Sequence, residues 1–362
     1  MCSAPVAVPR ASIVHSVPVM TPDGWIKHGE LRIGCQVYAA DGSITTVTGV
    51  GDEIVESSYR ITFRDGSIVD CAGTHSWPVD VFKGDARVRR IVTAVEMLAE
   101  GVTYRRPLTT GKTKATRDGV ARFRTLPSPA IIGQTADLGI DPYVLGYWLG
   151  DGDSDCARVT GSTDDLGAFI AQLDSLGIEH AHPSPTHGDT HRMRIGGGAQ
   201  KALRALGVLN SKHIPSAVLR ASLDQRWSVI QGIVDTDGTV SPTGQVEVCV
   251  RDNRLGDDIY ELAISLGLMP TKTYRNVTRM GRTYGPYVRI KFHPQPGEVV
   301  CRLSRKLARC KTENKIAPVS RSRTVVSVEE IETAPSRSLA VAHEGGGYLV
   351  GVHNVPTCAW QR

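Results

Sequence analysis

Two stretches of this sequence carry the same pattern, an apolar run that contains glycine and ends in an acidic residue followed by glycine. They are residues 141–153, DPYVLGYWLGDGD, and residues 226–238, RWSVIQGIVDTDG. An Asp before proline can start a helix at Pro142, so we expect two short helices that end at Asp151 and Asp237. A carboxylate at a helix C-terminus is disfavoured by roughly 0.3–1 kcal/mol. If the two ends lie side by side, a bound divalent cation would relieve the repulsion between the acids.

The glycines of these expected helices indicate how closely the helices pack. Gly146 and Gly150 are four residues apart, so they share one face of the first helix, and Gly232 offers a similar face on the second. Glycine inside a helix costs about 1 kcal/mol relative to alanine. A packing reason is therefore expected, namely close approach of two backbones at a face without side chains.

The paired pattern resembles the two motifs of LAGLIDADG homing endonucleases. Residues 145–152, LGYWLGDG, and residues 230–238, IQGIVDTDG, match in register, with Asp151 and Asp237 at the positions of the metal-binding acids. The resemblance implies Mg2+-dependent cleavage of both strands of a long, partly degenerate DNA site. One copy alone would more often be a buried helix before an Asp-Gly turn, but two copies favour the resemblance.

The expected elements between residues 135 and 312 occur twice. An apolar helix follows each acidic motif, over residues 166–177 and 255–267, and both helices end in Leu-Gly, a signal for a helix C-terminus. Short strands are expected between the helices. The repeat predicts a pseudosymmetric α/β domain at residues 135–312, with the two motif helices at its central interface.

Two expected strands of this domain carry alternating basic side chains. Alternation places Arg192 and Arg194 on one face of the first strand, and Arg289 and Lys291 on one face of the second. Such faces can lie in a DNA major groove and read base edges, whereas a solvated strand face is the alternative. Three arginines at the loop expected over residues 276–285 are candidates for phosphate contacts: Arg275, Arg279 and Arg282.

A basic residue is also expected to assist near the attacking water. Lys291 is our first candidate for this role. Lys212 is the second, and it lies in a segment, residues 210–219, that resembles the Lys-x-Ile-Pro element of intein-borne endonucleases. Spacing alone assigns the role to neither lysine.

The chain on either side of this domain is expected to be β-rich. Residues 17–25, 31–42 and 61–79 resemble successive blocks of a Hint domain, the domain of inteins and Hedgehog-type proteins, and residues 325–350 resemble its closing strands. The resemblance therefore implies a multidomain chain. An all-β Hint splicing domain, formed by residues 12–130 and 315–359, is interrupted by the α/β pseudosymmetric LAGLIDADG endonuclease domain.

Splicing needs a nucleophile at the N-terminal junction, and Ser12 is the nearest by spacing. In the Hint family a His at the place of His75 polarises the scissile peptide bond, although a structural histidine before a strand is the alternative. Trp77 resembles inteins that lack an N-terminal nucleophile and use an internal Cys, whose position here is Ser338. A hydroxyl is a far weaker nucleophile than a thiolate.

The C-terminal pattern departs further from the family. Related inteins end in Pro-Thr-His-Asn, and here Thr357 is in register but Cys358 and Ala359 replace His and Asn. Alanine has no amide that could cyclise. An earlier pair, His353–Asn354, is followed by Val355, which offers no nucleophile. We therefore expect an intein whose splicing is impaired.

Composition sets outer limits on the function. The chain has 362 residues, of which 41% are hydrophobic, and its net charge of +5 permits binding to nucleic acid without proving it. Eight cysteines without paired metal-ligand spacing indicate free thiols in a reducing compartment. No apolar run approaches the ~20 residues that span a bilayer, so we expect a soluble cytoplasmic monomer without a membrane partner.

The expected partners are double-stranded DNA, namely the intein-less allele of the host gene, and the flanking extein segments. Two other functions stay open at this point. One is a non-catalytic LAGLIDADG-derived DNA-binding regulator, and the other is a Hedgehog-like self-processing protein with an inert insert. The presence of both Asp151 and Asp237 argues against the regulator, because a protein that only binds DNA does not need the metal acids.

Overall fold

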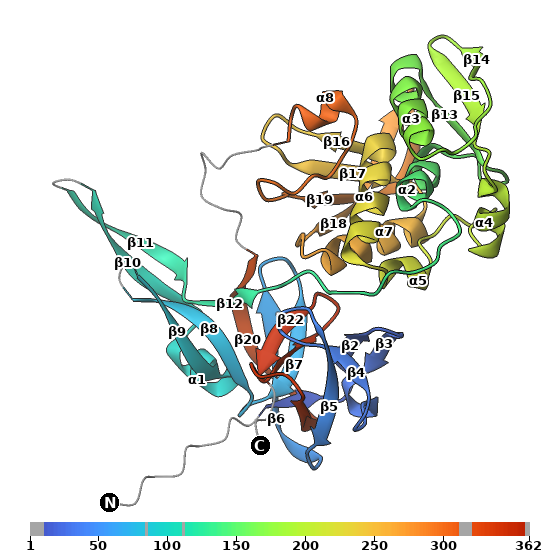
Figure 1. Cartoon of the computed structure of the whole chain (residues 1–362). Helices are drawn as coiled ribbons and strands as arrows, with labels where there is room; N and C mark the ends of the chain where they lie inside the picture. The colour runs from blue at the N-terminus through green and yellow to red at the C-terminus, as the bar shows by residue number, and fades with distance from the viewer. Residues whose placement is uncertain (1–10, 84–85, 111–112, 311–320, 359–362) are drawn as a thin grey trace, which may run out of the picture. The chain divides into compact units, whose positions relative to one another are not determined.

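The computed structural model describes residues 11–83, 86–110, 113–310 and 321–358, without the side chains of residues 82–86, 106–118 and 279. The chain divides into two compact units (Figure 1). The β unit comprises Met1–Ile132 and Ser320–Arg362, and the α/β unit comprises Gly133–Val319. The expected fold class, an all-β domain interrupted by an α/β domain, is confirmed by the elements of these units.

The described part of the β unit consists of strands, one short α-helix and a 3-10 helix, η1 (His28–Glu30). Its N-terminal part contains β1 (Ser12–Val14), β2 (Pro18–Thr21), β3 (Gly24–Lys27), β4 (Gln36–Tyr38), β5 (Ile44–Val50), β6 (Ile54–Phe63), β7 (Ile68–Ala72), β8 (Ser76–Lys83), β9 (Ala86–Thr93), α1 (Ala94–Glu100), β10 (Thr103–Thr110), β11 (Thr113–Ala121) and β12 (Phe123–Pro127). Its C-terminal part contains β20 (Ser322–Val341), β21 (Gly347–Val350) and β22 (Val355–Cys358).

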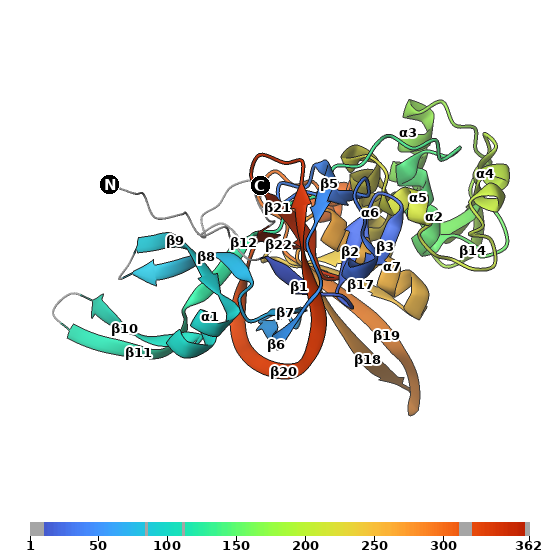
Figure 2. The same ribbon diagram turned by 90° about the horizontal axis from the view of Figure 1, so that it is seen from below.

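Strand β20 joins the two parts of the β unit. It pairs antiparallel with β6, where Val325 lies opposite Phe63, and also with β1, β5 and β12. The main sheet has the order β1-β7-β6-β20-β12-β8-β9, and Figure 2 shows β20 as its long curved strand. The two flanks of the insert therefore form one sheet, as the sequence predicts.

The α/β unit contains two similar halves (Figure 1). The first has α2 (Pro142–Asp151), β13 (Arg158–Ser162), α3 (Thr163–Ser175), β14 (Ser184–His187), β15 (Thr190–Arg194) and α4 (Ala199–Ala205), and α5 (Ser216–Leu219) follows. The second has α6 (Leu223–Asp237), β16 (Gly238–Val240), β17 (Val246–Val250), α7 (Asn253–Ser265), β18 (Thr271–Arg279), β19 (Arg282–Phe292) and α8 (Ser304–Leu307). Each half thus runs from an acidic helix through one strand (β13) or two (β16 and β17), and then through a helix to a hairpin.

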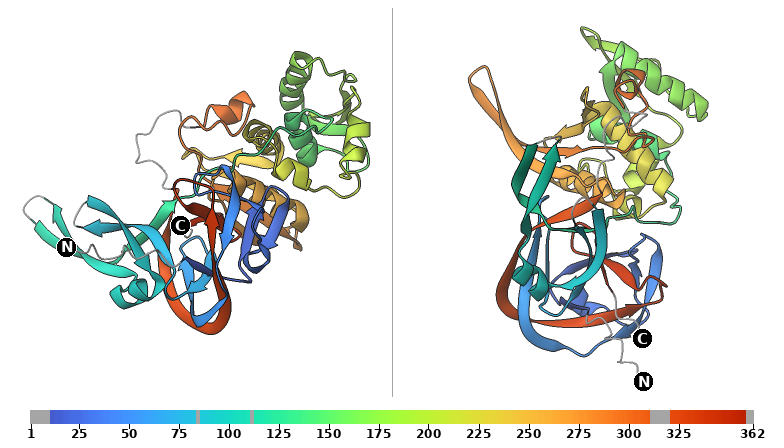
Figure 3. Two further views of the ribbon diagram at one scale, coloured as in Figure 1. Left: turned by 60° about the horizontal axis from the view of Figure 1, so that its bottom comes forward. Right: turned by 90° about the vertical axis from the view of Figure 1, so that its left-hand side faces the viewer.

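The hairpin of the second half is longer than the sequence predicts. Residues 276–285, expected as a loop, belong mostly to the paired strands β18 and β19. The turn between them is Met280-Gly281, with φ of 50° and 74°, and positive φ at both positions suits the twist of a two-residue hairpin turn. Figure 3 shows this hairpin projecting from the α/β unit.

Each unit has an apolar core of its own. The core of the β unit includes Phe63, Trp77 and Phe123, and the core of the α/β unit includes Trp148 and Phe169. All five side chains are at most 1% exposed. Among the described residues, no helix combines the length and the apolar character needed to cross a membrane.

Candidate functional site

Helices α2 and α6 pack against each other through the glycine faces that the sequence predicts. A methyl group at Gly146 would overlap with the backbone of Val229, and one at Gly232 would overlap with the backbone of Tyr143. The two helix backbones are therefore in direct contact. This contact holds the C-terminal ends of both helices at one place.

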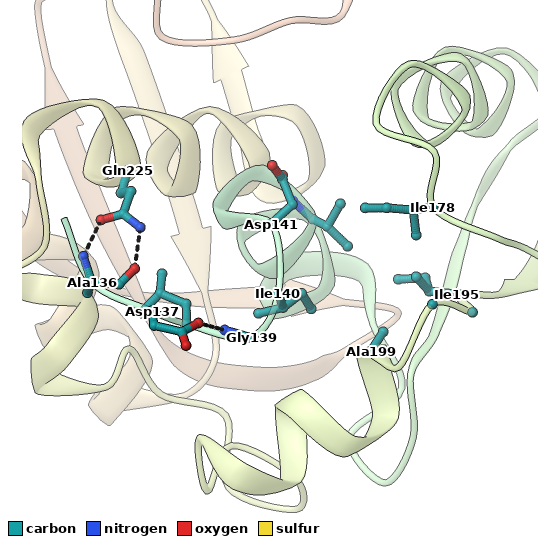
Figure 4. Close-up of a pocket in the computed structure, with 13 residues that line it drawn as sticks. Ala136, Asp137, Gly139, Ile140, Asp141, Ile178, Ile195, Ala199 and Gln225 are labelled. Atoms are coloured by element: carbon teal, nitrogen blue, oxygen red, sulfur yellow. Dashed lines mark hydrogen bonds between the residues drawn. The ribbon is translucent and has the colours of Figure 1, made fainter.

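Local capping fixes where the two helices begin. The Asp141 carboxylate accepts hydrogen bonds from two backbone N–H groups in the first turn of α2, at 2.9 and 3.1 Å. Ser222 and Gln225 form a capping box at the start of α6. The Gln225 amide also bonds the backbone N–H and carbonyl of Ala136, at 2.9 and 2.7 Å (Figure 4). These two hydrogen bonds of Gln225 tie the segment before α2 to the start of α6.

Asp151 and Asp237 end these helices in surroundings that disfavour negative charge. Asp237 Oδ2 would lie 3.3 Å from a methyl group on Gly150, so Asp237 reaches the end of α2. Burial raises the pKa of Asp237 to about 6, and the charge of Asp151 adds to this rise. Burial also raises the pKa of Asp151. Two half-buried carboxylates that repel each other offer the hard oxygen ligands that Mg2+ prefers, so the residues fit this metal.

A lysine binds the C-terminal end of each acidic helix. Lys212 Nζ donates to the carbonyl oxygens of two residues of α2, Leu149 and Gly150, at 3.1 and 3.0 Å. Lys306 Nζ donates to the carbonyl oxygens of three residues at the end of α6, each at 2.7 Å: Val234, Asp235 and Gly238. Burial lowers the pKa of both lysines, while the nearby aspartates oppose this shift. The two cations complement the negative ends of the helix dipoles.

Sequence reasoning missed Lys306. The signal that could have found it is the repeat, because Lys212 and Lys306 each follow the hairpin of their own half. A pocket of about 440 Å3 also opens beside the acids and is lined by Lys212, Asp237 and Tyr287, among others. Lys212 thus faces an open space next to the carboxylates, whereas Lys306 is 4% exposed.

Lys291 and Arg289 share a face of β19, as strand alternation predicts, and both pair with Glu247 on β17. Lys291 Nζ is 3.2 Å from Glu247 Oε2, and Arg289 Nε donates to Oε1 at 2.7 Å. Burial would raise the pKa of Glu247, but the hydrogen bonds from the two basic side chains lower it. The structure therefore places Lys291 in an ion-pair cluster on the sheet, while Lys212 lies at the end of α2.

Four of the other predicted DNA-binding arginines are exposed on the two hairpins. Arg192 and Arg194 flank the buried Met193 on β15, and Arg192 Nε lies 3.8 Å from Asp153. Two further arginines are exposed on the β18–β19 hairpin, Arg275 and Arg282. The side chain of Arg279 lies outside the described residues.

Three predicted residues of the β unit meet in its interior. His75 Nε2 and Thr357 Oγ1 are 2.6 Å apart. The rings of Trp77 and His75 pack edge to face, with their centroids 4.8 Å apart. Burial lowers the pKa of His75 to about 3, and a backbone contact with Ala11 opposes the shift. His75 is therefore neutral at pH 7 and lies beside the start of β1.

The remaining predicted splicing residues occupy different positions. Ser338 lies on β20 opposite Ser12 of β1 and is half-buried. Cys358 ends β22, and burial raises the pKa of its thiol to about 11. Asn354 is buried in the turn between β21 and β22 with a φ of 51°. Ala359 lies outside the described residues.

The fold and the two sites define a class of protein, in which a β-rich unit with a buried histidine is interrupted by a pseudosymmetric α/β unit with paired acidic helices. The chain is similar to the replicative DNA helicase DnaB of Mycobacterium intracellulare, with 28% identity over 348 residues. The match covers 94% of this chain and 57% of that protein, so the chain spans little more than half of its relative's length. A DnaB of Mycobacterium leprae is 26% identical over 115 residues, 30% of this chain and 19% of that protein. No protein-family model matches the chain.

The similar solved structures include an intein and a homing endonuclease. The MchDnaB-1 intein is 23% identical, and the match covers 31% of this chain and 77% of that chain with a TM-score of 0.20. I-DmoI in complex with DNA and Mn is 14% identical, and the match covers 43% of this chain and 89% of that chain with a TM-score of 0.31.

Proposed function

We propose that this chain is an intein in which the β unit is a Hint-type splicing domain and the α/β unit is a LAGLIDADG homing endonuclease. The observation that carries the nuclease is the pair of half-buried carboxylates, Asp151 and Asp237, at the ends of two helices in backbone contact. Similarity to DnaB helicases supports a helicase gene as the host. We further propose that the intein-less allele of that gene is the DNA target, and that a cytoplasmic monomer acts on it.

Asp151 and Asp237 would hold Mg2+ in this proposal. A divalent ion there supplies charge neutralisation at the phosphate and a more acidic bound water. Lys212 adds a positive charge beside both acids, whereas Lys291 is engaged by Glu247. We therefore assign the assisting role near the attacking water to Lys212.

Five arginines of the two hairpins would contact DNA. Arg192 and Arg194 in the first half, and Arg275, Arg279 and Arg282 in the second, supply positive charge for phosphates and donors for base edges. Arg289 differs, because its guanidinium is shared with Glu247. We expect Arg289 to link β19 to β17 through Glu247 and to contribute less to DNA binding than the other five arginines.

The test is cleavage of a duplex that spans the uninterrupted helicase gene. The full chain with Mg2+ should linearise a plasmid that carries this site, and chelation of Mg2+ should stop the reaction. Asp151→Asn and Asp237→Asn should each reduce cleavage by roughly 100-fold or more, because each removes a carboxylate that would hold the Mg2+ and its positive charge at the phosphate. If wild type and both variants bind DNA but do not cleave it, the nuclease proposal is wrong and the unit is a DNA-binding module.

For the β unit we propose impaired splicing. Thr357 and Trp77 contact a neutral His75. A neutral imidazole in this place can polarise a peptide bond near the start of β1 by hydrogen bonding. The nucleophile at Ser338 is a hydroxyl, and the thiol of Cys358 is mostly protonated because burial raises its pKa to about 11. Neither Cys358 nor Ala359 provides the side-chain amide needed for release.

Splicing is tested by expressing the chain between two flanking domains. Mass spectrometry should find mainly the unspliced precursor. Ser338→Cys should increase cleavage at the N-terminal junction, because a thiolate replaces a hydroxyl. Efficient ligation of the flanking domains by the unaltered chain would contradict this part of the proposal.

A further inference from the structure

Two cysteines of the α/β unit lie close enough to bond with each other. The Sγ atoms of Cys301 and Cys310 are 3.5 Å apart, in the segment that contains α8. Disulfide sulfurs are ~2.05 Å apart, so closure needs a movement of roughly 1.5 Å. Cys301 is fully buried, whereas Cys310 is partly exposed. Neither residue belongs to the two sites described above.

We infer that Cys301 and Cys310 form a reversible intramolecular disulfide, and that Cys310 is the thiol that a peroxide oxidises first. The contrast in exposure sets the order, because a soluble oxidant reaches Cys310 and not the buried Cys301. Burial also raises the pKa of the Cys301 thiol, which makes it a poor first reactant.

The reaction is balanced with hydrogen peroxide as the oxidant. Cys310 sulfur attacks one peroxide oxygen, the O–O bond breaks, and a sulfenic acid and water form. Cys301 sulfur then attacks the Cys310 sulfur, the S–O bond breaks, and a second water leaves with the Cys301 proton. Two thiols and one peroxide thus give one disulfide and two waters. A dithiol reductant reverses the bond by exchange.

The ring that this bond closes holds the end of α6. The backbone N–H groups of Arg302 and Leu303 donate to the Asp235 carboxylate at 2.8 and 3.1 Å. Lys306 Nζ lies within the same ring and binds the last carbonyl oxygens of α6. The disulfide therefore locks the segment that supports the helix end at Asp237. Any effect on DNA cleavage rests on the proposed nuclease function, but formation of the bond does not.

The experiment uses the full reduced chain, treated with hydrogen peroxide, alkylated and digested for mass spectrometry. Wild type should yield a linked Cys301–Cys310 peptide pair that is two hydrogen atoms lighter than the reduced pair. Its thermal unfolding midpoint should rise on the order of 5 °C, as expected for a short closed loop, and return after reduction. Cys156→Ser, which removes another partly exposed thiol, should behave as wild type does.

Two variants make the inference falsifiable. Cys301→Ser should trap the sulfenic acid of Cys310, detectable with a dimedone probe, and Cys310→Ser should abolish both the linked peptides and the rise in midpoint. Oxidation of wild-type Cys310 to sulfinic acid without linkage, or linkage to another cysteine, would overturn the inference. These measurements need no DNA, so their failure is separable from failure of the nuclease proposal.

Discussion

At the scale of single residues, charge and burial decide the character of both sites. The paired acids of the α/β unit are half-buried at helix ends, where partial burial and mutual repulsion raise the pKa of Asp237 to about 6. His75 of the β unit is fully buried, and its pKa falls to about 3. Burial therefore favours the neutral form of each group, in agreement with the cost of placing a charge away from water.

Replacement of Lys212 should test which lysine assists cleavage. Lys212→Met keeps the aliphatic stem and removes the ammonium beside the acids, so we expect a loss of DNA cleavage on the order of 100-fold. The matched control, Lys291→Met, removes a charge that is paired with Glu247 and should change cleavage only a few-fold. Rates of plasmid linearisation check both. A larger loss of cleavage in the Lys291 variant would show that Lys291, the first candidate from the sequence, is the assisting lysine.

The neutral state of His75 predicts how stability changes with pH. The unfolded state takes up a proton near pH 6.5, whereas the folded state does so only near pH 3. The contribution of neutral His75 to the stability of the β unit is therefore fully present above pH 6.5 and is lost as the pH falls from 6.5 towards 3. One such group gives a slope of up to about 1.4 kcal/mol per pH unit.

His75→Gln should reduce this slope. Hydrogen exchange in β7 and β8, measured between pH 7.5 and 4.5, reports the free energy of opening of the β unit. His28 keeps its own contribution in both proteins, because burial lowers its pKa to about 3 as well. Identical pH slopes for wild type and variant would show that His75 is not buried in its neutral form.

At the scale of elements, the contact between α2 and α6 positions the acids. Gly232→Ala places a methyl group against backbone atoms of α2, which cannot move aside as a side chain would. We expect the α/β unit to lose about 1–3 kcal/mol of unfolding free energy, the usual cost of overpacking, together with DNA cleavage.

A glycine of another helix provides the matched control. Gly167 lies in α3, and a methyl group there would have no neighbour within 4 Å. Gly167→Ala should therefore stabilise the unit by about 0.5–1 kcal/mol, since alanine favours the helix. Urea denaturation of both variants checks the difference. If the two substitutions had the same effect, the helices would not be in backbone contact.

At the scale of the whole molecule, each of the two units has a large apolar core of its own, so the chain should unfold in two transitions. Phe169 is buried in the α/β unit and stacks on Tyr147 at 3.9 Å, and Phe123 is buried in the β unit. Phe169→Ala and Phe123→Ala should each cost about 3–5 kcal/mol. Calorimetry should show that each substitution lowers the midpoint temperature of one transition and leaves the midpoint of the other unchanged. A single transition that both variants shift equally would mean that the two units unfold together.

The sequence by itself determined the features that depend on neighbouring residues. The N-cap at Asp141, the glycine spacing of α2 and the Leu-Gly ends of α3 and α7 are local signals, and the structure contains helices at these places. Gly177 and Gly267 follow those ends with φ of 67° and 71°. The repeat of these signals also predicted two similar halves, because equal patterns fold into equal elements.

Only the tertiary structure decided which distant side chains meet. Lys291 and Arg289 share a strand face as predicted, but the partner that engages them, Glu247, is on another strand whose register no local signal fixes. The same holds for Lys306 at the end of α6, and for Cys301 beside Cys310. Residues 276–285 formed strands rather than a loop because cross-strand pairing in the hairpin outweighed their polar composition. Hydrogen bonds within a turn or helix can be read from adjacent residues, whereas contacts between segments depend on how those segments pack.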